Sequence, residues 1–485
     1  MTDVAAVRVA GAPTARFLER VSRDFARAHL VLSDGLDGDG REVLLVARGT
    51  DPAAVWNTRV RLGREVVTVE ADPEAIARAI DAAYGGSQPR EAEPRAPESV
   101  ERDLAALLDE TSRDLLSTSG KAPLVRFLDT LLFEALSRGA SDLHLQPLPD
   151  RAIVRYRVDG TLHTVRDIDA HLLPALVSRV KVMGRMDIAE RRIAQDGRAT
   201  VRIGERQVDL RISTFPTNHG ERAVLRLLDK SRQQFELDLL GMPRAVEDRF
   251  LAAARRSHGL ILVTGPTGSG KTTTLYSTLR RIASPSVNIM TIEDPIEYEL
   301  SSVGLAVSQS QVQAKKGVSF STGLRHILRQ DPDVVLVGEI RDTETARMAI
   351  QSSLTGHLVF STLHTNDAPS AVTRLIDLGV EPYLLGASLT AVLAQRLVRT
   401  VHRPCRGEGC AACFGTGFLG RIGVFEFMGV EEPMRRLISA GAELEALREE
   451  ARRSGLRNLR EEGERLAGEE RTTLVEVERV VQGTR

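Results

Sequence analysis

The chain has few cysteines, few aromatic residues and no excess of charge of either sign. Its 485 residues include 3 Cys, 1 Trp and 4% aromatic residues, and 65 Lys and Arg against 66 Asp and Glu leave a formal net charge of -1. A balance so close to zero excludes a global basic field for nucleic acid or anionic lipid, and the scarcity of aromatics leaves little for base stacking. Three clustered cysteines do not form a disulfide framework; in a reducing compartment such a cluster more often binds metal or stays reduced.

The sequence also lacks the apolar runs of a signal peptide or a membrane span. The first residues, "MTDVAAVRVAGAPTARFLERV", show no basic start followed by a continuous apolar core. No later stretch reaches the roughly 18 apolar residues that a span needs. We therefore expect a cytosolic protein with no direct membrane insertion. The 42% hydrophobic and 27% charged residues are ordinary for a soluble globular protein.

Composition and periodicity divide the chain into four segments. Residues 1–85 alternate strand and helix patterns, which predicts a small α/β module. Residues 86–120 are a linker and a leading helix, because "GGSQPREAEPRAPESVERD" is rich in Pro, Glu, Arg and Ser. Residues 121–235 pass from a helical pattern to period two, which predicts an α+β domain with an antiparallel sheet. In residues 236–485 apolar strands alternate with helices, which predicts an α/β fold with a mostly parallel sheet and a charged helical end.

A phosphate-binding loop is predicted at "GPTGSGKT", between the apolar strand "LILVT" and a helix. Glycines at these positions let backbone N–H groups close around a phosphate, and the helix N-terminus adds its positive dipole end. The amine of Lys271 can reach the β- and γ-phosphates, and the Thr272 hydroxyl can ligate Mg²⁺. The predicted nucleotide contacts of this loop are Gly265, Pro266, Thr267, Gly268, Ser269, Gly270, Lys271, Thr272 and Thr273.

Acidic residues and one histidine follow the other predicted strands. The apolar run "DVVLV" ends at Glu339, whose carboxylate could hold Mg²⁺ or its water; an exposed loop glutamate is the plain alternative. "TIEDPIEYE" adds Glu293, Asp294 and Glu297, one of which could align the attacking water, unless the stretch is a solvated acidic turn. His364 in "STLHTND" could sense the γ-phosphate, although a lone histidine is more often structural.

These stretches, in this order, resemble the secretion ATPase superfamily that drives type II secretion and type IV pilus assembly. "GPTGSGKTTTLY" resembles its Walker A motif, "TIEDPIEY" its aspartate box, "LRQDPDVVLVGEIRD" its Walker B motif and "TGHLVFSTLHTNDA" its histidine box. The likeness extends to "ASDLHLQPLPDRAIVRYRVDG" and "RRIAQDGR" and covers roughly residues 120 to 480. It implies a RecA-like P-loop ATPase motor behind a PAS-like domain, with ATP and Mg²⁺ bound and a homohexamer as the working form.

The resemblance also assigns roles to arginines and acids that the sequence alone would leave as ordinary surface residues. Arg211 and Arg226 match arginines of the mobile second domain that reach the nucleotide, and Arg325 and Arg329 match motor-domain arginines four residues apart on one helical face. The family favours Glu339 for Mg²⁺ and its water. For activation of the nucleophile it leaves Glu297 or Glu293 open, and we favour Glu297.

The first module points to the subfamily. "FLERVSRDFARAHLVLSD" and "EVVTVEADPEAIARAIDAAY" resemble the compact first domain of type II secretion ATPases, which docks on the cytoplasmic part of a single-span inner-membrane protein. The resemblance implies an ATPase peripheral to the inner membrane of a bacterium, working with a membrane platform protein. A pilus-assembly or DNA-uptake motor is the near alternative, and a nucleic-acid translocase or a non-catalytic nucleotide-binding scaffold are the distant ones.

All three cysteines fall in "HRPCRGEGCAAC". The family often has two CxxC pairs there that bind zinc, whereas this chain has His402 where the first cysteine would stand and only four residues between Cys405 and Cys410. The spacing H-x₂-C-x₄-C-x₂-C still supplies a complete tetrahedral set from His402, Cys405, Cys410 and Cys413. We expect a structural zinc site within a subdomain of about residues 396–420; the alternative is a short loop with three reduced thiols.

Overall fold

A computed structural model describes residues 12–21, 23–62, 64–85, 121–203, 206–229, 236–237 and 239–482. The contacts within the chain form two compact units, Met1–Val100 and Glu101–Arg485. The second unit holds both segments predicted for residues 121–235 and 236–485, each with its own hydrophobic core. The predicted linker and leading helix of residues 86–120 lie outside the described residues.

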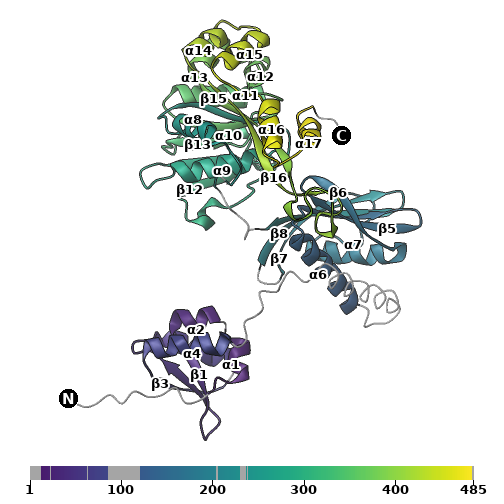
Figure 1. The fold of residues 1–485 in the computed structure, drawn as a ribbon, viewed down its shortest axis with the longest axis vertical. Coiled ribbons are helices and arrows are strands. Elements are labelled where there is room, and N and C mark those ends of the chain that lie inside the picture. Colours follow the sequence, from purple (N-terminus) through teal and green to yellow (C-terminus); the bar gives the residue numbers. More distant parts are fainter. Residues whose placement is uncertain are drawn as a thin grey trace, which may run out of the picture. The chain divides into compact units, whose positions relative to one another are not determined.

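The first unit is a small α/β module around a three-stranded sheet of order β1-β2-β3 (Figure 1). Strands β1 and β2 are antiparallel, and β2 and β3 are parallel. Buried apolar residues such as Phe17, Leu44 and Ile80 join the helices to the sheet. The elements are α1 (Ala15–Arg20), α2 (Arg23–His29), β1 (Val31–Leu36), β2 (Glu42–Val46), α3 (Pro52–Leu62), β3 (Val66–Glu70) and α4 (Pro73–Gly85).

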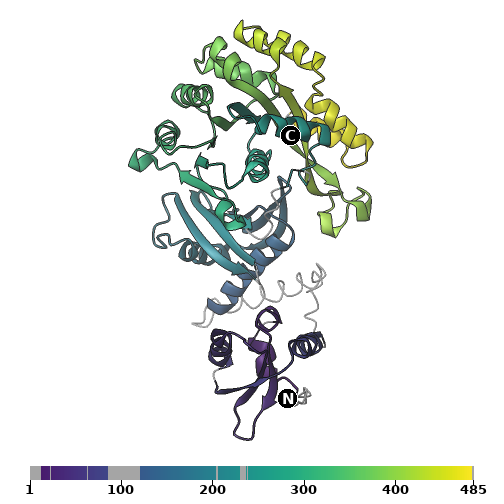
Figure 2. The ribbon, with the colours of Figure 1, turned by 90° about the vertical axis from the view of Figure 1, so that its left-hand side faces the viewer.

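The second unit begins with an α+β domain whose six-stranded antiparallel sheet has the order β6-β5-β4-β9-β8-β7. The predicted "VDG" turn is present, and Asp159 and Gly160 both take positive φ there, as a tight hairpin requires. Helices α6 and α7 pack against one face of the sheet (Figure 2). The elements are α6 (Lys121–Ser137), β4 (Asp142–Pro147), β5 (Arg151–Val158), β6 (Thr161–Asp169), α7 (Leu173–Met183), β7 (Gln195–Ile203), β8 (Arg206–Thr217) and β9 (Gly220–Asp229).

The motor domain is built on a seven-stranded sheet of order β12-β11-β13-β14-β10-β15-β16. The neighbouring strands from β12 to β15 pair in parallel, and β16 is antiparallel to β15. The runs predicted as buried strands are buried on both faces, since Leu260 and Leu262 face one core while Ile261 and Val263 face the other. The strands are β10 (Gly259–Thr264), β11 (Ile289–Glu293), β12 (Val307–Gln311), β13 (Val334–Val337), β14 (Leu358–Leu363), β15 (Leu389–Val401) and β16 (Phe418–Gly429).

Helices cover both faces of this sheet and form the charged helical end that the sequence predicts (Figure 1). One correction concerns α10, which ends at Ile327. Arg329 therefore follows the helix and does not share a helical face with Arg325, because the chain leaves the helix through a turn from Leu328. The helices are α8 (Arg244–Ala254), α9 (Lys271–Ile282), α10 (Phe320–Ile327), α11 (Thr343–Leu354), α12 (Pro369–Asp377), α13 (Pro382–Ser388), α14 (Glu432–Ser439), α15 (Leu444–Arg453), α16 (Leu459–Gly468) and α17 (Leu474–Val481).

Candidate nucleotide and metal sites

The phosphate loop lies between β10 and α9, at the C-terminal edge of the parallel strands. Lys271 opens α9 and is only 9% exposed, and its Nζ donates to Gly265 O at 2.7 Å and Pro266 O at 3.1 Å. Burial lowers the pKa of Lys271 to about 8, an effect that Glu339 opposes and Arg396 reinforces. Phosphate oxygens would compensate this amine for its lost hydration, which suits the predicted role.

A residue that the sequence reasoning missed supports this loop from β15. A side chain at Gly265 would place its Cβ 2.4 Å from Gln395 O, and one at Gly270 would place it 2.8 Å from Gln395 Nε2. Gln395 also accepts a hydrogen bond from Thr274 Oγ1 at 2.7 Å. The glycines are needed for close approach as well as for positive φ. Gln395 follows Lys271 by more than a hundred residues, so only the parallel pairing of β10 with β15 reveals its role.

Glu339 and His364 come together beside the loop. Glu339 lies just past β13 with a side chain 14% exposed, and it pairs with Arg341 Nη2 at 2.5 Å and His364 Nε2 at 3.6 Å. Burial and then the charge of Lys271 lower the pKa of His364, so this imidazole is largely neutral at pH 7. The Glu339 carboxylate and the half-buried Thr272 hydroxyl are oxygen donors of the kind that Mg²⁺ prefers. Arg341 is a second residue that the sequence analysis did not single out.

The acids of the aspartate box have different surroundings. Glu293 is 4% exposed, and its carboxylate accepts hydrogen bonds from Tyr276 Oη, from Thr291 Oγ1 at 2.6 Å and from Gln309 Nε2 at 3.0 Å. The carboxylate of Glu293 is therefore occupied inside the domain. Asp294 is exposed and helps to raise the pKa of Arg341.

Glu297 faces the second domain of the same chain. Arg211 on β8 donates to Ile296 O at 3.1 Å and lies 3.5 Å from Glu297 Oε1. The side chains of Arg211 and Glu297 keep 23% and 34% exposure, so the pair remains open to solvent and to a ligand. Of the box acids that the family resemblance favours, Glu297 is the accessible one.

The other predicted arginines contact other groups. Arg226 on β9 is 58% exposed and donates to Asp142 Oδ1 at 3.0 Å. Arg325 pairs with Glu344 at 3.2 Å, and both side chains are more than half exposed. Arg329 donates to Arg325 O at 3.0 Å.

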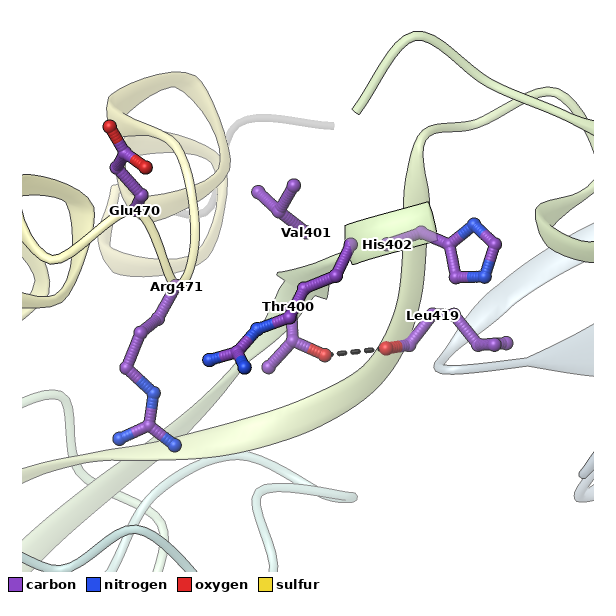
Figure 3. A pocket seen from close by; sticks show the side chains of 7 residues that line it. Thr400, Val401, His402, Leu419, Glu470 and Arg471 are labelled. Atoms are coloured by element: carbon purple, nitrogen blue, oxygen red, sulfur yellow. Dashed lines mark hydrogen bonds between the residues drawn. The ribbon is translucent and has the colours of Figure 1, made fainter. Parts of the chain in front are cut away.

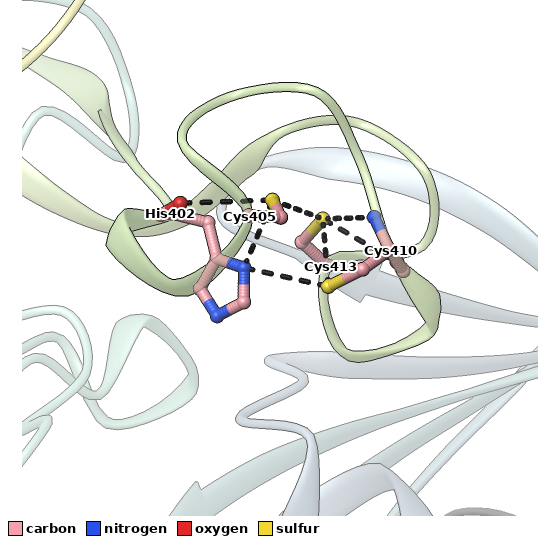
Figure 4. Close-up of side chains that lie close together, drawn as sticks. All are labelled: His402, Cys405, Cys410 and Cys413. Atoms are coloured by element: carbon pink, nitrogen blue, oxygen red, sulfur yellow. Dashed lines mark hydrogen bonds between the residues drawn. The ribbon is translucent and has the colours of Figure 1, made fainter.

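The histidine and the three cysteines converge in one cluster between β15 and β16 (Figure 4). His402 Nδ1 lies 3.2 Å from Cys405 Sγ and 3.5 Å from Cys410 Sγ. Cys413 Sγ lies 3.8 Å from Cys405 Sγ and 3.7 Å from Cys410 Sγ. A tetrahedral zinc ion with Zn–S bonds of about 2.3 Å separates its sulfurs by about 3.8 Å. The four groups therefore fit a closed zinc site.

Backbone donors prepare Cys413 to be a thiolate ligand. Cys410 N lies 3.1 Å and Gly417 N 3.3 Å from Cys413 Sγ. Burial opposes ionisation of this thiol, but these hydrogen bonds outweigh it and lower the pKa of Cys413 to about 6. The thiolate is the form that binds metal.

A small cavity of about 280 Å³ adjoins the cluster (Figure 3). It is walled by β15, β16 and the turn before α17, and Thr400 Oγ1 donates to Leu419 O across it. It lies apart from the phosphate loop in the sequence and on different strands. Its lining residues are Thr400, Val401, His402, Arg403, Leu419, Glu470 and Arg471.

Comparison with known proteins decides the family. The family model described as "Type II/IV secretion system protein" matches residues 117–479. The chain belongs to this family. The type II secretion system protein HxcR of Pseudomonas aeruginosa is 46% identical over 455 residues, which cover 92% of this chain and 96% of that protein. The type II secretion system ATPase E of Vibrio cholerae is 45% identical over 407 residues, 78% of this chain and 80% of that protein.

Two solved structures share the fold. The ATPase DotB of Legionella pneumophila, 21% identical, matches 74% of this chain and 96% of its own with a TM-score of 0.60. The pilus retraction motor PilT, solved with bound ADP and 28% identical, matches 72% of this chain and 95% of its own with a TM-score of 0.52. The predicted α/β class with a RecA-like motor is confirmed. Among the helices of the described ranges, none has the length and apolar character of a membrane span.

Proposed function

We propose that this family member is a Mg²⁺-dependent ATPase that powers protein export by type II secretion, as a homohexamer at the bacterial inner membrane. The observation that carries the proposal is the meeting of Lys271, Glu339 and His364 at one strand edge, with Arg211 of the mobile domain against Glu297. Family membership supports a secretion ATPase, and the near full-length match to HxcR includes most of the first module.

In the proposed reaction each group has one role. Backbone N–H groups of residues 267–270 and the Lys271 amine hold the phosphates, and Glu297 orients the attacking water and takes its proton. Thr272 and Glu339 would hold Mg²⁺, which neutralises charge on the phosphates. His364 stays uncharged beside Glu339, so it can donate a hydrogen bond without adding a charge. Glu293 holds the aspartate box in position through its hydrogen bonds with Tyr276 and Gln309.

The second domain completes the site when it closes. Arg211, and Arg226 beside it, would stabilise charge that spreads over the γ-phosphoryl oxygens. Hydrolysis removes that charge and weakens the contact, so the arginine-bearing face of the second domain can move away from the nucleotide. A few kcal/mol per site is typical of such gated closures. In the hexamer this motion would pass to the membrane platform protein.

Steady-state ATPase assays of the purified hexamer test the clamp. Glu297→Gln and Arg211→Ala should each lower kcat by about tenfold to a thousandfold while the hexamer still forms. Glu464→Gln, an exposed acid on α16, is the matched control and should leave kcat unchanged. Unchanged turnover in both Glu297→Gln and Arg211→Ala would reject this assignment of roles.

A pilus motor remains the second candidate because of the structural likeness to PilT. The first unit separates the two functions, since its sequence resembles the first domain of type II secretion ATPases, which docks on a single-span inner-membrane protein. Coexpression of the full chain with that protein from a neighbouring secretin gene cluster should give a stable complex, and a chain starting at residue 101 should not. Retained binding by the shortened chain would contradict docking through residues 1–85.

A further inference from the structure

Three arginines stand side by side across the sheet of the second domain. The antiparallel register places Arg198 on β7 opposite Arg211 on β8, and Arg211 opposite Arg226 on β9. Residues opposite each other on neighbouring strands project from the same face. The flanking residues Leu210 and Leu225 are buried against the helical side. The three guanidinium groups therefore share the face that carries Arg211 to the aspartate box.

In the described part of the chain, carboxylates pair directly with only two of the three guanidinium groups in this row. Directly opposed like charges destabilise a sheet. Asp142, opposite Arg226, pairs with that arginine at 3.0 Å, and Glu297 approaches Arg211 at 3.5 Å. The Arg198 guanidinium makes no hydrogen bond or ion pair with the residues that the structure describes. Because the Arg198 guanidinium has no carboxylate partner among these residues, the row is suited to bind an anionic ligand.

Two cavities flank the row, and Arg198 and Arg211 line both. One, of about 560 Å³, also includes Arg185, Asp209 and Glu297; the other, of about 580 Å³, includes Asp142, Asp196 and Arg226. The position of β7 is fixed on the helical side of the sheet, where its backbone packs closely on α7. A Cβ at Gly197 would lie 2.4 Å from Gly184 O at the end of α7. Arg198 is thus held at the same opening as Arg211, within reach of the same ligand.

We propose that Arg198 is a third cation of the clamp and contacts the phosphates of the bound nucleotide together with Arg211 and Arg226. This rests on the ATPase function proposed above. Arg198→Ala should lower kcat/KM for ATP about tenfold to a hundredfold, and Arg198→Lys should recover part of it as a point charge. The matched control is Arg202→Ala, because Arg202 is exposed on the same face of β7, four residues on, and lines neither cavity.

The assay separates failure of this inference from failure of the function. Wild-type turnover that is lost in Lys271→Ala establishes the ATPase independently of Arg198. Equal kcat/KM in Arg198→Ala, Arg202→Ala and the wild type would then overturn the third-cation proposal alone. A purely structural role for Arg198 would lower the melting temperature and would not be rescued by lysine, which also counts against the proposal.

A second inference comes from the other face of the His/Cys cluster. Phe414, directly after Cys413, stacks on His163 of β6 at 4.8 Å between ring centroids and 17° between planes. The Arg138 guanidinium lies 4.6 Å from the Phe414 centroid, and this ring packs against the core of the second domain. Nearby, Gly420 N donates to Asp159 Oδ2 at 2.7 Å, which adds a polar contact to the same hairpin.

The metal cluster determines where Phe414 points. Phe414 has a φ of +54°, an unfavourable value for a residue with a side chain, and it follows a short turn closed by Cys410 and Cys413. Loss of the metal ion that the four ligands would share would release that turn. We infer that the His/Cys loop is a metal-dependent anchor that restrains the second domain against the motor of its own chain.

Hydrogen exchange of the full chain tests the anchor. Zinc chelation and Phe414→Ala should each raise exchange of residues 151–169, and the two together should add little, because both act through the same contact. Phe414→Ala should retain the metal, as measured by elemental analysis. Phe215→Ala, an exposed phenylalanine of β8, is the control and should leave exchange at residues 151–169 unchanged. Unchanged exchange in either treatment, or fully additive effects, would overturn the anchor.

Discussion

The phosphate loop and the His/Cys loop are both glycine-rich turns of one domain, but different structures hold them. Gly265 and Gly270 of the phosphate loop press against Gln395, a fully buried residue of the central sheet. In the His/Cys loop the close contacts are internal, since a Cβ at Gly409 would lie 2.5 Å from Gly415 O. The first loop is preformed by the core of the fold. The second depends on its own turns and on the ligand that its four side chains would share.

The largest effect is expected from a variant that removes the charge of the phosphate loop and leaves its backbone conformation intact. Lys271→Ala should lower ATP turnover by at least about a hundredfold, because no other buried cation of the loop reaches the phosphates. The melting temperature should stay the same or rise, since a desolvated amine is removed. Steady-state kinetics and thermal unfolding measure the two effects. Lys315→Ala, an exposed lysine, is the control, and a similar loss of turnover there would contradict the assignment.

Metal removal should affect the other loop alone. The wild type should hold about one zinc per chain, and Cys410→Ser should hold almost none, because the tetrahedral set loses a thiolate. Hydrogen exchange should then rise across residues 402–420, while the affinity for ATP stays within about twofold. Added zinc should reverse chelation in the wild type and not in Cys410→Ser. Metal-free wild type with unchanged exchange would support the reduced-thiol alternative.

A matched pair of glycines sharpens the contrast. Gly417 has a φ of +77° and a Cβ there would lie 2.1 Å from Gly407 O, whereas Gly415 has a φ of +71° and nothing within 4 Å. Both alanine variants carry backbone strain of about 1 kcal/mol. Only Gly417→Ala also pushes two backbone segments apart. Elemental analysis should therefore find zinc lost in Gly417→Ala and retained in Gly415→Ala; equal zinc content in the two would refute the clash.

The sequence predicts the phosphate loop better than its surroundings, for a physical reason. Buried parallel strands are short apolar runs, and the glycines, lysine and threonine of the loop are local, so both can be recognised along the chain. Gln395 and the pair β15 and β16 are not local, because they meet the loop only through sheet pairing. Nothing in the apolar patterns of β15 and β16 indicates that these strands meet the phosphate loop.

The acids and arginines show the same limit. The stretch "TIEDPIEYE" does not reveal that Glu293 is occupied inside the domain and that Glu297 is accessible, because two of the three groups that donate to Glu293, Tyr276 and Gln309, lie elsewhere in the sequence. Arg198 becomes visible only when the register sets it opposite Arg211. The His/Cys cluster is the opposite case. Its four ligands lie within twelve residues, so a local stretch of sequence, read with the family's CxxC pattern, predicted the set that the structure brings together.

A pH-dependent effect on stability tests the support beneath the phosphate loop. Glu426 on β16 is 3% exposed and accepts hydrogen bonds from Ala368 N at 2.7 Å and Leu459 N at 3.2 Å. Burial raises its pKa to about 7; Asp367 adds to this, while both N–H groups and Arg396 oppose it. The folded state therefore binds more protons than the unfolded state between pH 4.5 and 7, so this group's contribution to stability is lost as pH rises through that window.

Other groups titrate in the same range, so the difference from a non-titrating variant isolates this one. The free energies of unfolding of Glu426→Gln and the wild type are measured by denaturant titration. The value for Glu426→Gln minus that for the wild type should increase by on the order of 3 kcal/mol from pH 4.5 to 7. The loss of one carboxylate oxygen as an acceptor in Glu426→Gln changes the free energy of unfolding by the same amount at every pH. The same gain should appear in the Cys410→Ser background, because Glu426 lies in the sheet and not in the metal loop. A gain that vanishes there would mean that the two loops share their support, and the contrast between them would fail.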